Sequence, residues 1–231
     1  VIWAGTDDGN LQITRDAGVS WMNVVKNVPG VPAGTWVSRV EASPHAEGRA
    51  YVTFDGHRSG DMKTYVFRTD DFGATWRAVT ASPVEGYAFI LKEDPVNSRL
   101  LFLGTEFGLW ISLDEGKQWA RFSGNLPKVA IHDIAIHPRE HDVILATHGR
   151  GVYIIDDITP IRALTTEMMA KEVALLPARV AQMTIEAQAY PFGAAGDFVG
   201  ANPSEAATIT YWLRKRHLFG DLKVEVYDAE G

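Results

Sequence analysis

The sequence predicts an all-β fold, a partial β-propeller of four-stranded blades followed by a short linker and a β-sandwich-like hairpin. The first observation is a phrase that occurs three times, at residues 14–21, 69–76 and 112–119: a hydroxyl residue, Asp two positions later, Gly two after that, and Trp three further on. The second is its spacing, because consecutive Asp residues lie 55 and 43 residues apart. The shorter period is typical of one propeller blade, and the longer period fits a blade with an insertion.

Each copy of the phrase is expected to form a tight turn between two strands. Asp can accept hydrogen bonds from the backbone two residues on, and Gly supplies a positive φ. The Trp opens the next strand and is expected to be largely buried between blades. We interpret the repeated residues as structural, because they recur in every blade whereas an active site occurs once. They are Asp16, Gly18, Trp21, Asp71, Gly73, Trp76, Asp114, Gly116 and Trp119.

Residues 1–164 are predicted to contain a partial blade and then three further blades, about three and a half blades in all. The first of these three spans residues 37–79 and the second spans residues 88–122. The third begins at residue 133, and residues 161–164 are its best candidate for a last strand. Propellers close with four or more blades. We therefore expect either a homodimer or the remainder of a longer propeller to complete the ring.

The pattern changes after Pro160. Residues 165–203 are predicted to form a linker, with a possible short helix at 168–176 that begins near Thr165 and a Gly/Ala-rich loop at 190–203. Residues 204–231 are predicted to begin a β-sandwich-like domain. Its alternating segments, residues 208–214 and 222–227, read as a hairpin.

Composition excludes several classes of partner and site. The 231 residues carry a net charge of −7 and have no basic patch, so nucleic acid is not an expected partner. No apolar run is long enough to span a membrane, so a membrane partner is not expected either. The absence of cysteine rules out disulfides and thiolate metal sites.

The repeated phrase resembles the Asp-box of the BNR repeats found in sialidases, xyloglucan-cleaving glycosidases and the sortilin (Vps10) propeller. Residues 148–160 and 5–10 are similar to segments of large bacterial sortilin-like proteins, usually called glycosyl hydrolases. The resemblance covers residues 1–165, and residues 200–231 loosely. It implies a bacterial protein, periplasmic or secreted, although no signal peptide is recognisable in this chain. It also implies a β-sandwich after the propeller and a glycosidase-like hydrolase acting on a carbohydrate or another small molecule.

Strand order places one set of polar side chains on one rim. The entrance to the first strand of a blade and the loop between its second and third strands share a face, opposite the Asp turns. Glycoside cleavage uses two carboxylates. The candidate catalytic carboxylates are Asp55, Glu106 and Asp133. The candidate substrate-binding residues are Trp36, Arg39, His57, Arg58, Tyr87, His132, His148 and Arg150.

Two alternatives remain open from the residues. Asp7, Asp8 and Asn10 offer the oxygen ligands that Ca²⁺ prefers. No cofactor is certain, but bound Ca²⁺ would suit a propeller hydrolase of lactones or esters. The other alternative is a non-enzymatic module that binds carbohydrate or peptide inside the ring.

Overall fold

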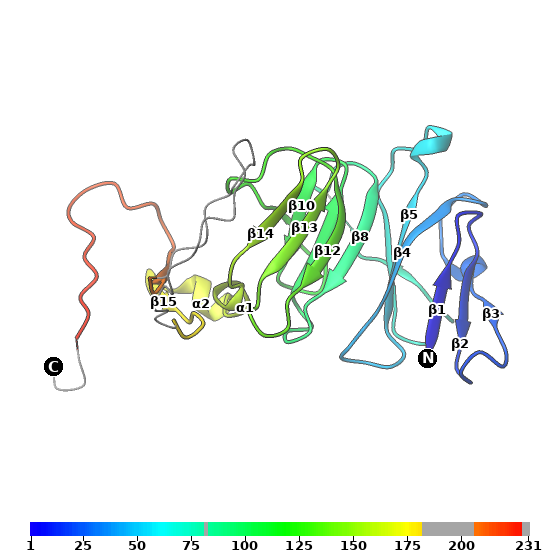
Figure 1. Ribbon diagram of the computed structural model, residues 1–231, viewed down its shortest axis with the longest axis horizontal. Coiled ribbons are helices and arrows are strands. Elements are labelled where there is room, and N and C mark those ends of the chain that lie inside the picture. The colour runs from blue at the N-terminus through cyan, green and yellow to red at the C-terminus, as the bar shows by residue number, and fades with distance from the viewer. Residues whose placement is uncertain (81–82, 182–205, 228–231) are drawn as a thin grey trace, which may run out of the picture. The chain divides into compact units, whose positions relative to one another are not determined.

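The computed structural model describes residues 1–80, 83–181 and 206–227. The chain divides into two compact units, residues 1–158 and residues 159–231. The first unit is a series of antiparallel sheets (Figure 1). The predicted Gly/Ala-rich loop and the last four residues of the chain lie outside the described residues.

Four sheets follow one another along the first unit, and in each the strands are ordered as in the chain. The first sheet contains β1 (Ile2–Gly5), β2 (Leu11–Thr14) and β3 (Met22–Asn23). The second contains β4 (Trp36–Ala42), β5 (Ala50–Asp55), β6 (Tyr65–Thr69) and β7 (Arg77–Ala78). The third contains β8 (Ala88–Glu93), β9 (Leu101–Thr105), β10 (Gly108–Ser112) and β11 (Ala120–Arg121). The fourth contains β12 (Ile131–Ile136), β13 (Val143–Thr147) and β14 (Val152–Ile155). This arrangement confirms the predicted all-β partial propeller.

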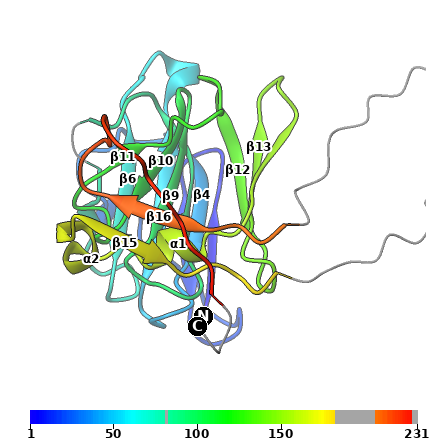
Figure 2. The same cartoon turned by 90° about the vertical axis from the view of Figure 1, so that its left-hand side faces the viewer.

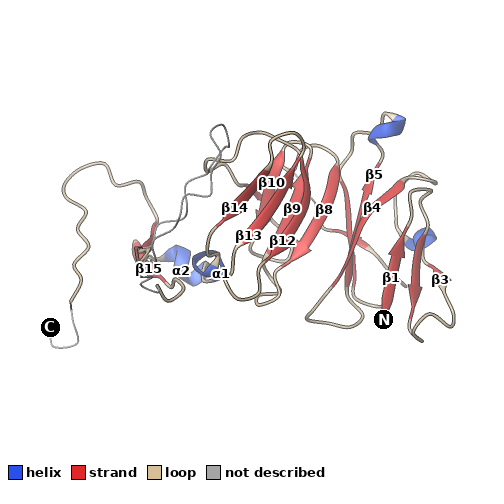
Figure 3. Cartoon of the chain, in the orientation of Figure 1, coloured by secondary structure: helices blue, strands red, loops and turns tan. Residues whose placement is uncertain are grey.

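The sheets pack face to face through their innermost strands, with β4 against β1 and β8, and β8 against β12. The regular structure of this unit consists mainly of strands, with short 3₁₀ turns η1 (Val25–Asn27) and η2 (His57–Ser59) in its loops (Figure 3). Turning the molecule by 90° shows β9, β10 and β11 side by side (Figure 2).

Every residue of β5 is buried, because both faces of its sheet are covered. Successive side chains of a strand point to opposite faces. Val52 and Phe54 therefore join the core shared with the first sheet, while Tyr51 joins the core shared with the third. Each internal sheet thus has two apolar faces and depends on both neighbours.

The repeated phrase forms the same turn three times. In the first copy the Thr14 hydroxyl accepts from the backbone N of Gly18 at 2.9 Å. One Asp16 carboxylate oxygen accepts from the backbone N of Ser20 at 2.9 Å, and the other accepts from the Ser20 hydroxyl at 2.6 Å. The residue after each Asp also has a positive φ, 58° at Ala17. The predicted turn is confirmed, but the Asp accepts from the residue four positions on, not two, because the hydroxyl residue takes the Gly N–H.

The three Trp residues do not share one environment. Trp76 and Trp119 are buried, with 8% and 6% of their surface exposed, as predicted. The Trp119 indole donates to the Val79 carbonyl of the preceding sheet at 2.8 Å, and Trp76 packs edge-to-face on Trp3 of the first sheet at 5.9 Å. Trp21 is 46% exposed, so its predicted burial is wrong. Trp76 and Trp119 each pack on the sheet before their own, whereas no described sheet precedes the one that contains Trp21.

The second unit corrects three local predictions. Residues 161–164 were expected as a strand, but α1 (Thr159–Arg162) forms there, since Pro160 suits the first turn of a helix. The predicted helix is shorter: α2 (Thr166–Ala170) begins at its N-cap Thr165 and is followed by β15 (Val173–Leu176).

The predicted hairpin is also different. Its first strand forms as β16 (Thr210–Leu213) but pairs with β15, and residues 222–227 form no strand. The alternation of exposed and half-buried residues along β15 suits a strand with one covered face. No helix in the described part of the chain is long and apolar enough to cross a membrane.

Replacing Trp119 by Ala is expected to lower the free energy of unfolding by about 3–5 kcal/mol, because it opens a cavity between two sheets and removes the bond to Val79. Trp21→Ala is the matched control, with an expected loss below about 1 kcal/mol because that ring is half exposed. Denaturant unfolding measures both. Equal losses at the two positions would contradict the packing described here.

The Asp turns are expected to make stability depend on acid pH. Hydrogen bonds from Ser20 and Thr14 hold the pKa of Asp16 at about 2, below its ordinary 3.8, and bonds from Thr75 and Thr69 lower the pKa of Asp71. A carboxylate whose pKa is lower in the folded state stabilises the protein above its unfolded pKa. This contribution is lost as the pH falls from about 4 to about 2. The denaturation midpoint should therefore fall across this window, and by less in the Asp16→Asn, Asp71→Asn double variant. An equal fall in both proteins would refute the role of the turns.

Candidate functional site

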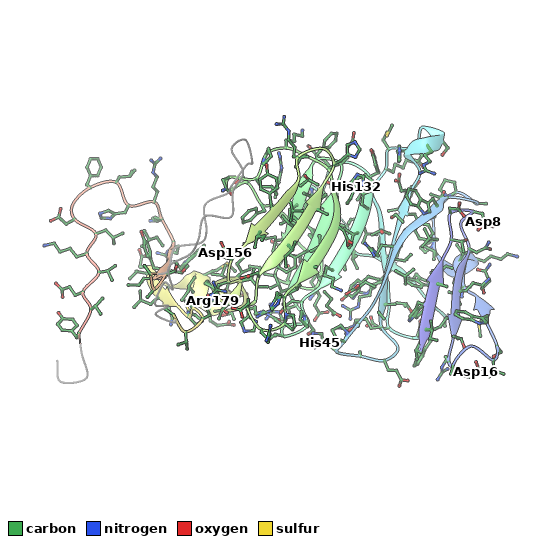
Figure 4. All side chains as sticks on the ribbon, in the orientation of Figure 1. Asp8, Asp16, His45, His132, Asp156 and Arg179 are labelled. Atoms are coloured by element: carbon green, nitrogen blue, oxygen red, sulfur yellow. The ribbon has the colours of Figure 1, made fainter. Side chains whose placement is uncertain are left out.

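The two ends of the first unit carry different loops (Figure 4). Asp8 and His132 lie toward one end of the strands, and Asp16 of the first Asp turn and His45 lie toward the opposite end. The strand order predicts this separation. The candidate site therefore lies at the end away from the Asp turns.

A β-bulge occurs at the same place in three successive innermost strands. The pairing register shifts between Val37 and Arg39 in β4, between Ala88 and Ile90 in β8, and between Ile131 and Asp133 in β12. The residues left without a cross-strand partner are Ser38, Phe89 and His132. A bulge locally redirects side chains and is common beside functional sites. Here it brings one side chain from each of three blades to a shared surface.

A cleft of about 430 Å³ lies on this surface. Its walls come from β4, η2, β8 and β12. They are formed by Trp36, Ser38, His57, Arg58, Phe89 and His132. Four of these were predicted as substrate-binding residues, whereas Ser38 and Phe89 were missed. Aligning the blades would have suggested both, because Ser38 in β4 and Phe89 in β8 stand at the position that His132 occupies in β12.

Aromatic and imidazole rings form a continuous row across the cleft. His57 stacks on Tyr87 with ring centres 4.6 Å apart, and Tyr87 meets Phe89 at 5.1 Å. Phe89 then packs on His132 at 4.0 Å, and His132 stacks on His148 at 5.2 Å. The row links η2 of one blade to the β13–β14 loop two blades away. It offers flat faces that can pack against a ligand.

Charge around the row is set by its neighbours. Partial burial lowers the pKa of His132 most, and repulsion from the neighbouring His148 lowers it further. Burial raises the pKa of Tyr87, and the nearby carboxylates of Glu106 and Asp55 add to this effect. The Arg58 guanidinium lies over the Trp36 ring, 4.7 Å from its centre. The cleft thus combines a cation with imidazoles and apolar ring faces.

The three candidate carboxylates have different surroundings. Asp55 is buried, and one of its oxygens accepts from His57 Nδ1 at 2.6 Å and from the His57 backbone N at 2.9 Å. Its other oxygen is buried and has no hydrogen-bond partner among the described residues. Asp133 is exposed and pairs with Arg39 at 2.5 Å, which joins β12 to β4 across the intervening blade. Glu106 lies in the β9–β10 turn, where its backbone N donates to the Tyr87 carbonyl at 3.1 Å.

Asp7, Asp8 and Asn10, which the sequence predicts as Ca²⁺ ligands, lie in the turn between β1 and β2. The Asp8 carboxylate accepts from the Asn10 amide at 2.9 Å and from the Thr6 hydroxyl. These bonds close the β1–β2 turn. Within the described residues, no group of three or more His, Cys, Asp or Glu side chains is arranged to hold a metal ion. Asp7 and Arg150 are exposed on their loops, outside the residues that line the cleft.

Comparison with known proteins shows likeness to xyloglucan-degrading enzymes. The chain is 32% identical over 84 residues to an oligoxyloglucan-reducing end-specific xyloglucanase of Emericella nidulans, covering 36% of this chain and 10% of that protein. A GH74 enzyme of Niastella koreensis superposes with a TM-score of 0.52 at 18% identity, covering 67% of this chain and 26% of the other. The GH74 xyloglucanase of Xanthomonas campestris gives 0.50 at 18% identity, covering 77% and 30%. No protein-family profile matches the chain. These structural likenesses show the fold, a β-propeller.

Replacing His148 by Asn is expected to raise the pKa of His132, because it removes the neighbouring imidazole that disfavours a positive charge there. The part of the lowering that comes from burial should remain. An NMR titration of the His132 ring measures the change. Arg150→Gln, in the same loop, is the control and should leave the titration unchanged. A pKa of His132 that stays the same or falls in the His148 variant would contradict the repulsion between the two imidazoles.

Proposed function

We propose that this chain forms part of a hydrolase that acts on carbohydrate, with the cleft of about 430 Å³ as its sugar-binding site. The observation that carries the proposal is the row of rings beside carboxylates from successive blades. Binding sites combine mainly apolar walls with a few polar groups that fix orientation. Trp36 and Phe89 supply flat apolar faces, and Arg58, His57 and His132 supply groups that bond to hydroxyls.

The proposed catalytic groups are Glu106 and Asp133. Glycosidases place two carboxyl groups on either side of the scissile bond. Asp133 is exposed, and its pair with Arg39 holds its position. Glu106 lies beside Tyr87, the ring that stacks on His57 in the row. Asp55, the third candidate, is buried, so it would act on the cleft through His57 rather than by direct contact.

Xyloglucan is the proposed substrate class. Support comes from the names of two relatives, the xyloglucanases of Emericella nidulans and Xanthomonas campestris. The chain spans only a tenth of the curated relative, so the activity of the whole protein is part of the proposal. The resemblance to sortilin-like BNR proteins and the periplasmic or secreted location stay predictions. The same holds for ring completion by a homodimer or by the remainder of a longer propeller.

The test uses xyloglucan oligosaccharides, with binding followed by calorimetry and cleavage by release of reducing ends. Trp36→Ala should weaken binding about tenfold or more, since it removes a flat wall of the cleft. Glu106→Gln and Asp133→Asn should keep the affinity but lower turnover by about 100-fold or more, because general acid–base catalysis typically accelerates a reaction by at least that factor.

Asp16→Asn, at the opposite end of the strands, is the control and should change neither binding nor turnover. Full turnover in both amide variants would place catalysis elsewhere. Tight binding with no cleavage by the unaltered chain would instead identify a binding module.

A further inference from the structure

Asp55 and His57 form a buried carboxylate–imidazole pair at the wall of the cleft. Asp55 is 2% exposed, whereas the His57 side chain is 33% exposed and lines the cleft. The 2.6 Å contact joins an Asp55 oxygen to His57 Nδ1. A carboxylate can only accept, so in the neutral imidazole this bond places the proton on Nδ1 and leaves Nε2 as an acceptor.

Two contacts hold the ring of His57, and a third fixes its backbone. Its backbone N donates to the same Asp55 oxygen at 2.9 Å, which fixes the start of the turn η2. Its plane lies within 17° of the Tyr87 ring at a centroid distance of 4.6 Å. The bond to Asp55 and the stacking on Tyr87 both restrict rotation of the ring. Such fixing of a base before substrate arrives is a common requirement of catalysis.

We infer that His57 is the general base for hydrolysis of an ester bound in the cleft, and that Asp55 is its positioning residue. Carbonyl substitution by water needs a base that takes a proton and then returns it, which an imidazole does. Acetal cleavage instead requires an acid at the leaving oxygen and a second carboxylate. The inference therefore adds an acyl-ester substrate class to the carbohydrate of the proposed function. It shares the cleft with that function but not its catalytic carboxylates.

The steps balance with water as the only co-reactant. Nε2 of His57 takes a proton from water as the water oxygen bonds to the carbonyl carbon, and the carbonyl π electrons move to its oxygen. That oxygen carries the negative charge, which the nearby Arg58 cation stabilises. The carbonyl then reforms, the bond to the alcohol oxygen breaks, and that oxygen takes the proton back from Nε2. The products are a carboxylic acid and an alcohol.

Water, rather than a serine, is the nucleophile in this scheme. The cleft contains Ser38, but its hydroxyl lies 3.1 Å from the Ala88 carbonyl and 2.8 Å from the Thr53 hydroxyl. Ser59 follows His57 in η2, and its hydroxyl donates to the Gly56 carbonyl at 2.9 Å. Both serines are thus engaged within the protein.

The probe is p-nitrophenyl acetate, measured with and without EDTA, and then acetylated xyloglucan oligosaccharides. His57→Gln should lower kcat/KM by about 100-fold. Asp55→Asn should lower kcat with little change in KM, because its amide can donate to Nδ1 and so favours the wrong tautomer. His45→Gln, in a loop at the opposite end where its ring bonds the Asp94 carbonyl, should retain full activity. EDTA should have no effect.

A second measurement needs no substrate and no folded variant of Asp55. ¹⁵N NMR of the unaltered chain, with the His57 signals assigned by their loss in His57→Gln, should show a protonated Nδ1 and an unprotonated Nε2. The opposite tautomer would overturn the inference, as would ester turnover that EDTA abolishes or that His57→Gln leaves intact. Failure of xyloglucan cleavage alone would refute the proposed function and leave the ester activity standing.

Discussion

Burial of both faces of each internal sheet is the constraint on which the rest of this propeller segment depends. β5 is buried along its whole length, so neither neighbouring sheet can be removed without exposing half of its side chains. The sheets approach so closely that a Cβ on Gly104 would lie 2.6 Å from the Ile131 carbonyl of the next blade. No described sheet precedes the first one, and Trp21 in that sheet is 46% exposed.

The two ends of the strands divide structure from chemistry. At one end, each of the three hydroxyl–Asp–Gly turns bonds its own Gly backbone N–H to the hydroxyl side chain of the same turn. At the other end, the bulges release Ser38, Phe89 and His132 from the regular pairing of the innermost strands. Because the same irregularity recurs at the same place, three blades contribute equivalent positions to one cleft. The repeat that builds the fold therefore also builds the site.

The features that repeat, and those formed by residues close along the chain, could be predicted from the sequence. The Asp turns and most strands were predictable because hydroxyl, Asp, Gly and Trp stand at fixed spacing. The exposure of Trp21 was not, because burial depends on a sheet that the motif does not encode. Residues 173–176 read as helix or strand equally well in a short apolar run, and only pairing with β16 decides between them.

Within the site, the limit was geometric. Four lining residues of the cleft followed from strand order alone. Ser38 and Phe89 carry neither a charge nor an imidazole that would mark them, and only their equivalence to His132 in the next blades indicates them. The ion pair of Arg39 with Asp133 joins residues 94 positions apart across a whole blade. Asp55 was predicted as a carboxylate facing substrate, whereas the fold buries it beneath His57. Distance along the chain cannot show which of two rim residues covers the other.

The burial of Asp55 carries an energetic consequence. One of its oxygens is bonded to His57, but the other is buried with no hydrogen-bond partner among the described residues. An unsatisfied buried acceptor costs about 1–3 kcal/mol, and more when it is charged. An apolar residue would avoid this cost, since every residue of the surrounding strand is buried. What the carboxylate provides in exchange is a fixed imidazole at the cleft wall. A buried polar group without a full set of hydrogen bonds departs from the usual preferences of a protein core. Such departures are expected at functional positions.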